Sequence, residues 1–523
     1  MKVLMISPQM PLSIYSFSKI LRFWRFKGHY PPLSLITVAA LLPREWQLRL
    51  VDLNFESLTE EMWAWADLVM ISGMIKQRPN MLALIRDAKS RGKTVVAGGA
   101  YPSTMPEELL EAGVDFLIKG EGETTIPRFL EGLAEGRQSG VFECETKPDL
   151  TKSPIPRFDL LNLKAYQSLS IQTSRGCPHD CEFCSVVQLL GRRPRYKKAG
   201  QVINELEAIY RLGFRGPIFV CDDNFISSKT HARAILKELI PWNKSLGEPF
   251  SFLTQVTVSL GEDVPLIDLM TDARFSEVII GIESPDEEAL IISHKNQNLL
   301  ASMEDSLNRI KANGLSIVGS FILGLDGEKP GVGDRIISLI EATSIPLVLI
   351  HLLQPVPNTR LWQRLEREGR LLPNQFQELP DLELMGTGTY YIPNRPAGEI
   401  TSEFLKVWET AYEPRRFLGR AYRFFTDMRP TREAMARKRG HHQPPSVTPE
   451  PLRQQLWGLY SLLNISWQLG VVSSTRWQYW RQLLSIIRKN PSRLINYLCA
   501  CALAEDMFMS RDLICRQARA AGS

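Results

Sequence analysis

The sequence lacks several features that would assign the chain to a class of protein at once. No apolar run reaches the roughly 20 residues that a bilayer-spanning helix needs, and the longest candidate, residues 494–504, is too short. There are only eight cysteines in 523 residues and no charged-then-apolar leader, so we expect a reducing, cytoplasmic setting rather than a secreted, disulfide-linked chain. A net charge of +5 is too balanced for a nucleic-acid-binding protein.

The first 135 residues predict a doubly wound, Rossmann-like α/β domain. Short apolar runs alternate there with helical patterns, and we expect buried parallel strands at 3–7, 48–52, 68–72, 94–97 and 114–119. In such a sheet the ligand lies outside the carboxyl ends of the strands, at the point where the strand order reverses.

The residues after these strands favour a shallow bowl for a flat, bulky cofactor. Glycine and small residues follow the third, fourth and fifth runs, at 72–74, 98–103 and 120–123. For any one of these glycines taken alone, an ordinary αβ turn is the better explanation, and only together do they favour the bowl. The G-x-G-x-x-G loop of dinucleotide-binding domains is missing after the first run, and so is the acidic cluster of a receiver domain.

A second α/β series begins after a proline-containing linker at 136–168. Between 169 and 370, six apolar runs separated by helical patterns predict an incomplete parallel (β/α)6 barrel, with strands at 170–174, 218–221, 250–258, 277–282, 316–323 and 347–352. Catalytic groups belong at the carboxyl ends of such strands.

Three cysteines follow the first of these six runs with the spacing Cys-x-x-x-Cys-x-x-Cys: Cys177, Cys181 and Cys184. Three thiolates this close together can hold three irons of a 4Fe-4S cluster and leave the fourth iron open. A structural zinc site would need a fourth ligand, and His179 is awkwardly placed for that role. A disulfide with one spare thiol suits a secreted chain better.

Polar residues also follow the other runs of this series. The sequence has Asp222, Asp223 and Asn224 after the second, Gln255 within the third, Glu283 and Ser284 after the fourth, and Gly324 after the fifth. Polar groups that recur at one rim of an apolar barrel indicate a site rather than a packing face.

The cysteine loop after the first strand of a six-unit barrel resembles the radical S-adenosylmethionine (SAM) superfamily. The resemblance implies that SAM chelates the open iron and is cleaved reductively to a deoxyadenosyl radical. It also implies SAM contacts from Phe183, Asp222, Asp223, Asn224, Gln255, Glu283, Ser284 and Gly324.

A doubly wound domain before such a barrel resembles the cobalamin-binding subclass of that superfamily. The runs PRFDLL, SRGCP, CEFCSVVQLLGRRPR, DDNFI, GIESPDEEAL and KNQN are similar to hopanoid A-ring methylases, and the chain also resembles bacteriochlorophyll side-chain methylases and ring cyclases. No Asp-x-His-x-x-Gly run is present, so we expect no histidine ligand to cobalt. The resemblance implies a cobalamin pocket walled by Ser72, Met74, Gly98, Gly99, Ser103, Glu121 and Gly122.

The resemblance implies a cobalamin-dependent radical SAM C-methyltransferase that acts on an unactivated carbon of an apolar, hopanoid-like, isoprenoid-like or tetrapyrrole-like small molecule. Its partners would include an electron donor such as a ferredoxin or flavodoxin and no nucleic acid. One alternative is an enzyme of the same subclass that catalyses oxidative cyclisation or rearrangement without methylation. Another is a cobalamin- or cluster-carrying sensor without turnover.

The region from 371 to 523 predicts a helical C-terminal domain, which we expect to cover the barrel mouth. It contains a basic stretch at 429–439, a proline-rich break at 443–451 and the tryptophans Trp457, Trp467, Trp477 and Trp480. A solvated basic face with tryptophans in the helical core explains this composition. Peripheral contact with an anionic membrane surface explains it as well.

Overall fold

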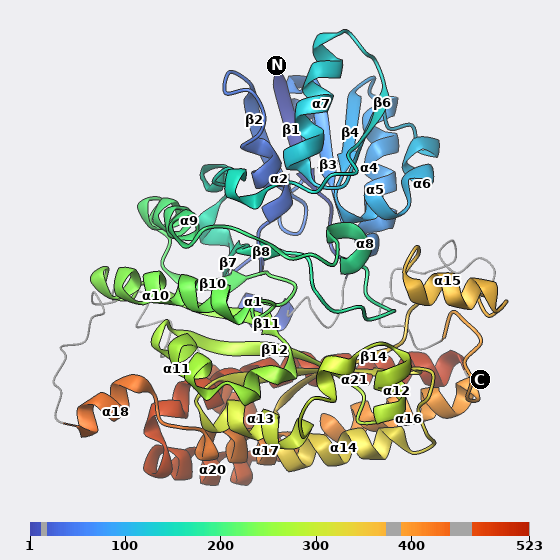
Figure 1. Ribbon diagram of the computed structural model, residues 1–523. Helices are drawn as coiled ribbons and strands as arrows, with labels where there is room; N and C mark the ends of the chain where they lie inside the picture. Colours follow the sequence, from blue (N-terminus) through green and yellow to red (C-terminus); the bar gives the residue numbers. More distant parts are fainter. Residues whose placement is uncertain (12–17, 373–388, 440–462, 522–523) are drawn as a thin grey trace.

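The computed structural model describes residues 1–11, 18–372, 389–439 and 463–521. An N-terminal α/β domain lies above a second parallel α/β sheet, and the C-terminal helices gather below and behind that second sheet (Figure 1). This is the predicted fold class. The predicted proline-rich break at 443–451 and Trp457 lie outside the described residues.

The first sheet has six parallel strands, one more than predicted. They are β1 (Lys2–Ser7), β2 (Gln47–Asp52), β3 (Leu68–Ser72), β4 (Thr94–Gly98), β5 (Phe116–Lys119) and β6 (Gly140–Glu143). Their spatial order is β2-β1-β3-β4-β5-β6, so the order reverses at β1 and β3. The segment of β6 was predicted as linker, because of its four residues only Phe142 is buried and the apolar signal is weak.

Helices cover both faces of this sheet, as a buried parallel sheet requires. On one face lie α3 (Glu60–Trp65), α4 (Arg78–Ser90), α5 (Ala100–Thr104) and α6 (Pro106–Glu111), and on the other α2 (Leu33–Ala39) and α7 (Gly122–Ala134). Two separate apolar clusters result, one on each side. The carboxyl edge of the sheet faces the second sheet (Figure 1). Ligand-binding residues are expected at this edge.

The second sheet has the six strands that the sequence predicts. They are β7 (Leu169–Ile171), β10 (Gly216–Val220), β11 (Phe250–Val256), β12 (Phe275–Glu283), β13 (Ser316–Leu323) and β14 (Leu347–Leu352), each parallel to the next in that order. The two end strands, β7 and β14, form the edges of the sheet. A short antiparallel ribbon, β8 (Ser174–Arg175) with β9 (Arg195–Tyr196), frames the cysteine loop.

Helices cover the outer face of this partial barrel, and alternate residues of each strand face inward. The main outer helices are α9 (Ala199–Arg211), α10 (Lys229–Ser245), α11 (Val264–Asp272), α13 (Met303–Ala312) and α14 (Val332–Thr343). In β12, Val278, Ile280 and Ile282 are fully buried, whereas the alternate residues Glu277, Ile279 and Gly281 are only half-buried. Shorter helices are α1 (Ser18–Phe23), α8 (Val186–Leu190), α12 (Glu287–Ile292) and α15 (Arg360–Arg367).

The described C-terminal helices do not cover the barrel mouth, so that expectation was wrong. They are α16 (Ala397–Ala411), α17 (Pro414–Asp427), α18 (Arg432–Lys438), α20 (Arg476–Lys489) and α21 (Leu494–Ala521). Arg429 pairs with Asp268 at 2.6 Å, and Arg493 donates to the carbonyl of Gly314 at 3.2 Å. These partners precede β12 and β13, at the amino end of the barrel. The basic residues of these helices predict acidic partners. The sequence pattern does not indicate at which end of the barrel those partners lie.

No helix in the described ranges has both the length and the apolar character needed to cross a membrane.

Candidate active site

The three cysteines lie on one tight loop that leaves the carboxyl ends of β7 and β8. The Cys184 amide donates to the carbonyl of Cys181 at 3.1 Å, and the Cys177 amide donates to the carbonyl of Gly191 at 3.2 Å. Gly176 has a φ of +92°, and a Cβ there would lie 2.8 Å from the Gly191 oxygen, so this turn requires glycine. Cys181 is buried and the other two thiols are half-buried.

The Asp222–Asp223 pair anchors the chain just before the first cysteine. Asp222 is fully buried and accepts four hydrogen bonds, from the amide and hydroxyl of Thr173 and of Ser174, at 2.5–3.1 Å. Asp223 accepts the Gly176 amide at 3.0 Å. Burial raises the pKa of both carboxyls, that of Asp223 to about 6. The acidic pair therefore positions the cysteine loop, and Asp222 has its oxygens occupied.

The KNQN run links the cysteine loop to the end of β12. Lys295 forms a buried ion pair with Glu283 at 2.7 Å, and the Gln297 amide lies 3.4 Å from the Cys181 sulfur. Asn298 donates to the carbonyls of Gly281 and Ile282 at 3.0 and 2.9 Å. Although burial opposes the lysine charge, the Glu283 carboxylate and the neighbouring cysteine sulfurs hold the pKa of Lys295 above its ordinary value.

The other residues predicted to contact SAM lie at the same carboxyl edge. Their side chains differ in exposure and in whether their polar atoms already have hydrogen-bond partners. Asn224 is 3 % exposed, and its Oδ1 finds no donor in the described part of the chain. Gln255 is exposed at the end of β11, and Phe183 packs half-buried beside Leu325. Ser284 is fully buried and accepts the amide of Asp286 at 3.2 Å. Asn224, Gln255 and Phe183 are thus the open candidates.

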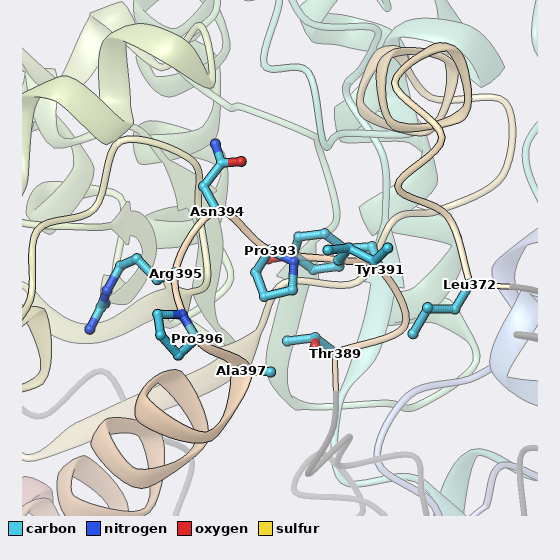
Figure 2. A pocket seen from close by; sticks show the side chains of 9 residues that line it. Leu372, Thr389, Tyr391, Pro393, Asn394, Arg395, Pro396 and Ala397 are labelled. Carbon is cyan, nitrogen blue, oxygen red and sulfur yellow. The ribbon is translucent and has the colours of Figure 1, made fainter.

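A shallow hollow is formed by Leu372, Thr389 and residues 391–397 (Figure 2), and Gly324 is bonded to one of its lining residues, Tyr391. The Tyr391 hydroxyl donates to the Gly324 carbonyl, and a Cβ on Gly324, whose φ is +96°, would lie 2.8 Å from that hydroxyl. Arg395 points away from Leu372 (Figure 2) and pairs with Glu403 at 2.6 Å. The hollow offers mainly apolar lining, so we assign the chemistry to the cysteine loop instead.

The donor set on this loop fits a 4Fe-4S cluster. Burial raises the pKa of the thiols of Cys177 and Cys184, that of Cys184 to about 12, so cluster binding would displace protons. The positive charge of Lys295 compensates the thiolates that result. No three His, Cys, Asp or Glu side chains among the described residues converge on a single metal ion. A cluster in which each thiolate takes its own iron needs no such convergence.

Small residues predicted to contact cobalamin lie at the carboxyl edge of the first sheet. Gly99 has a φ of +104°, and a Cβ there would lie 2.6 Å from the Ser72 hydroxyl and 3.1 Å from the Gly73 carbonyl. The Ser103 hydroxyl bridges two strand ends, since it donates to the Gly99 carbonyl and accepts the Gly120 amide. Gly98 packs against Ile118, Gly122 against Val38, and Met74 is half exposed.

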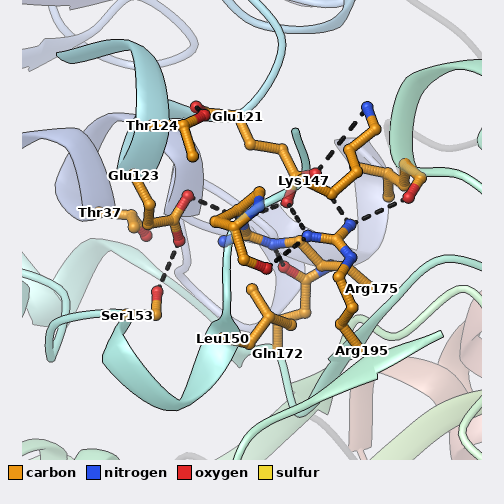
Figure 3. A network of polar contacts seen from close by, with 12 residues as sticks. Thr37, Glu121, Glu123, Thr124, Lys147, Leu150, Ser153, Gln172, Arg175 and Arg195 are labelled. Carbon is orange, nitrogen blue, oxygen red and sulfur yellow. Dashed lines mark hydrogen bonds and ion pairs between the residues drawn. The ribbon is translucent and has the colours of Figure 1, made fainter. Parts of the chain in front are cut away.

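Glu121, which was predicted to line the cobalamin pocket, pairs with arginines of the second domain (Figure 3). Its carboxylate pairs with Arg175 at 2.9 Å and with Arg195 at 2.8 Å. Arg175 also pairs with Glu123 at 2.9 Å, and Glu123 accepts the Ser153 hydroxyl at 2.6 Å. The side chains of both carboxylates are less than 10 % exposed. This network fixes the carboxyl edge of the first sheet against the cysteine loop.

The half-buried positions along the barrel strands are mixed in character. Phe219, Leu253, Ile279, Val318 and Ile322 are apolar, whereas Ser251, Glu277, Ser320 and His351 are polar. Tyr30 packs on Phe219 with ring centroids 4.9 Å apart. Glu277 lies among these positions, and burial raises its pKa to about 7.

The sequence did not predict the ion pairs and hydrogen bonds that four residues of the site form. These residues are Lys295, Gln297, Arg175 and Arg195. The KNQN run was noted only for its resemblance to hopanoid methylases, and the two arginines were not singled out. A charged side chain twelve residues after Glu283 was the one local signal for the buried ion pair.

Three family descriptions match successive parts of the chain. Residues 23–130 match the B12 binding domain, residues 171–338 the radical SAM superfamily, and residues 359–520 a domain of unknown function, DUF4070. The predicted order of a cobalamin-binding domain before a radical SAM barrel is therefore confirmed.

Two curated proteins are similar over most of their length. An uncharacterized methyltransferase of Synechocystis sp. is 41 % identical over 98 % of this chain and 92 % of its own length. The hopanoid C-2 methylase of Rhodopseudomonas palustris is 32 % identical over 89 % of this chain and 85 % of its own. The structure of OxsB, a cobalamin-dependent S-adenosylmethionine radical enzyme, shares the fold with a TM-score of 0.58 at 15 % identity, covering 97 % of this chain and 79 % of OxsB.

Proposed function

Because the chain belongs to the family of cobalamin-binding radical SAM methyltransferases that includes hopanoid C-2 methylase, we propose that it methylates an unactivated carbon of a hopanoid- or isoprenoid-like lipid. Membership makes it an enzyme that uses cobalamin, SAM and a 4Fe-4S cluster, so the alternative of a sensor without turnover falls away.

The observation that carries the substrate class is the apolar surface that Phe219, Leu253, Ile279, Val318 and Ile322 contribute along the barrel strands. Polar side chains are also present on these strands, at Gln255, Ser320 and His351. A substrate rich in hydrocarbon loses water-exposed surface there, which favours binding by about 25 cal/mol per Å² buried. The similarity to hopanoid C-2 methylase over 89 % of the chain supports the same class.

When bound, the cluster and SAM supply a carbon radical, and cobalamin supplies the methyl group. This chain's own residues have four tasks. Cys177, Cys181 and Cys184 hold the cluster, and the unpartnered Asn224 oxygen would accept the SAM amino group at the rim. The surface around Gly99 and Ser103 would receive the cobalamin face. The junction at Glu121 and Arg175 would exclude water between the two sites.

We also propose that a small electron-transfer protein, a ferredoxin or a flavodoxin, reduces the cluster. SAM cleavage in this family consumes one electron that neither SAM nor cobalamin provides. Cys177 and Cys184 are half-buried rather than fully enclosed, which keeps the cluster loop near the protein surface.

The test is anaerobic reconstitution of the full chain with iron, sulfide and cobalamin, followed by incubation with methyl-labelled SAM and a lipid and pigment extract. We expect a labelled hopanoid or isoprenoid lipid, found by mass spectrometry, and none with a Cys177→Ala variant. Label in a tetrapyrrole instead of a lipid would overturn the substrate class.

The second candidate is oxidative cyclisation or rearrangement by the same cofactors, as the resemblance to ring cyclases suggests. The same incubation separates the two. A substrate-derived product that carries no SAM-derived methyl carbon, formed together with 5'-deoxyadenosine, would favour this alternative.

A further inference from the structure

The helix α20 has two apolar faces, and only one of them is packed. Tyr479, Leu483 and Ile486 join the main hydrophobic core. Four other large apolar residues recur three and four positions apart on the outer side, and they are Trp477, Trp480, Leu484 and Ile487. Their exposed fractions run from 38 to 77 %. A helix that already buries one face gains no stability from a second apolar stripe, so the stripe points to an interaction.

A π-helical turn, η8 (Gln468–Val472), extends this apolar area. Val471 and Val472 are exposed, as is Trp467 just before the turn. The indole N–H of Trp480 donates to the Gly470 carbonyl at 2.8 Å, and a Cβ on Gly470 would lie 2.8 Å from that ring. The turn is therefore fixed against α20. Trp480 has its polar atom satisfied and turns only ring surface outward.

The charged residues around this apolar area of the sequence are all basic. None of the 57 acidic residues of the chain lies between Glu450 and Glu505, and the basic residues there are Arg453, Arg476, Arg481, Arg488, Lys489 and Arg493. Arg476, Arg481 and Arg488 are exposed and flank the apolar stripe. Within the described ranges no carboxylate pairs with these three, whereas Arg429 and Arg432 nearby both have acidic partners.

We propose that η8 and the outer face of α20, here called the α20 surface, bind an anionic lipid membrane. Tryptophan rings lie favourably at the headgroup level, the aliphatic side chains reach the acyl boundary, and the arginines meet lipid phosphates. A second copy of this chain fits less well, because it would bring two basic surfaces together.

This inference rests on the proposed function for its purpose, since hopanoid- and isoprenoid-like lipids reside in membranes and the enzyme would meet its substrate there. Membrane binding itself depends only on the α20 surface. It can therefore be measured without SAM, cofactors or turnover.

The test is flotation of the full-length chain with vesicles of phosphatidylcholine alone or mixed with phosphatidylglycerol. We expect flotation with the anionic vesicles that weakens with added salt. Replacing two arginines, as Arg481→Gln with Arg488→Gln, should weaken partitioning about 30-fold at low salt. Leu484→Ser should weaken it about tenfold on both vesicle types.

Matched control variants distinguish binding through the α20 surface from nonspecific adsorption to the vesicles. Leu110→Ser makes the same change at a similarly exposed position in α6, and Arg211→Gln removes an exposed arginine from α9. Both should float like the wild type. The inference would be overturned if the wild type did not float with anionic vesicles. It would also be overturned if the α20 variants floated as well as the wild type. A Leu484→Ser variant that changes the sedimenting mass but not flotation would assign the surface to self-association instead.

The two proposals fail separately. Flotation without any labelled lipid product leaves the α20 surface intact and overturns the proposed function. Labelling of detergent-dispersed lipid without flotation overturns only the membrane inference.

Discussion

Glu121, at the carboxyl end of the first sheet, forms a 2.9 Å ion pair with Arg175, two residues before the first cysteine of the second domain. The side chains of the two partners are only 5 % and 13 % exposed. Asp223 holds Gly176 between Arg175 and Cys177. The carboxyl edge of the first sheet and the cysteine loop are therefore connected through a few consecutive residues, and we expect their separation to be set here.

Replacing Glu121 by Gln tests this connection. The change leaves Arg175 and Arg195 with less compensating charge in a buried place, and breaking such a pair costs about 3–5 kcal/mol. We expect a lower free energy of unfolding in urea and more 5'-deoxyadenosine formed per methylated product. The control is Glu143→Gln, which removes the exposed partner of Lys119 in the same domain. If the Glu121 variant formed as much 5'-deoxyadenosine per methylated product as the wild type, the network would not position the two sites.

The strands of both sheets could be predicted because buried parallel strands leave continuous apolar runs in the sequence. VLMIS, LVMIS and SIVGSFIL are examples, and each became a strand within a residue or two of the expected ends. The strand GVFE was missed because one face of it is open and only Phe142 supplies a signal.

The contacts within the site could be predicted less well, because their partners are far apart in the chain. Asp222 was recognised as a polar residue after a strand, but its bonds to Thr173 and Ser174 cross 49 and 48 positions. The resemblance and its place after a strand put Glu121 in the cobalamin wall, but they did not indicate its partner Arg195, which lies 74 residues away. Position along a strand predicts which edge a residue reaches, while its bonding partner depends on the three-dimensional packing.

Asp222→Asn should impair cluster assembly rather than catalysis alone. Asp222 accepts four hydrogen bonds from Thr173 and Ser174. In asparagine one carboxylate oxygen becomes an NH2 group, so the neutral side chain keeps one acceptor oxygen and the two hydroxyls must reverse to accept from it. We expect iron and sulfide content per chain after reconstitution to fall severalfold. Asp159→Asn, at an exposed linker position paired with Arg157, is the control. Full iron content in the Asp222 variant would contradict the anchoring role.

Gly99→Ala should reduce cobalamin retention. The added Cβ would lie 2.6 Å from the Ser72 hydroxyl on a backbone with φ of +104°, so the edge of the sheet must shift. Gly136→Ala is the matched control, because its φ is +81° but nothing lies within 4 Å of the added carbon. We expect cobalamin absorbance after desalting to fall in the first variant and not in the second. Equal loss in both would mean that backbone strain, not the cofactor surface, is responsible.

Glu277 should make stability depend on pH. Burial in the barrel interior raises the pKa of this carboxyl to about 7, above its ordinary value of 4.5. Between these two values the folded chain keeps a proton that the unfolded chain has lost, so the free energy of unfolding falls as pH rises, by about 3 kcal/mol in total. Glu277→Gln removes this loss. We therefore expect the variant to gain stability over the wild type in urea at pH 8 but much less at pH 5.

The control for this comparison is Glu207→Gln, which removes a carboxylate on the outside of α9 that pairs with Arg211. Its effect should be small and the same at both pH values. A stability difference between the Glu277 variant and the wild type that does not change from pH 5 to pH 8 would mean that this carboxyl titrates normally, with water reaching it freely inside the barrel.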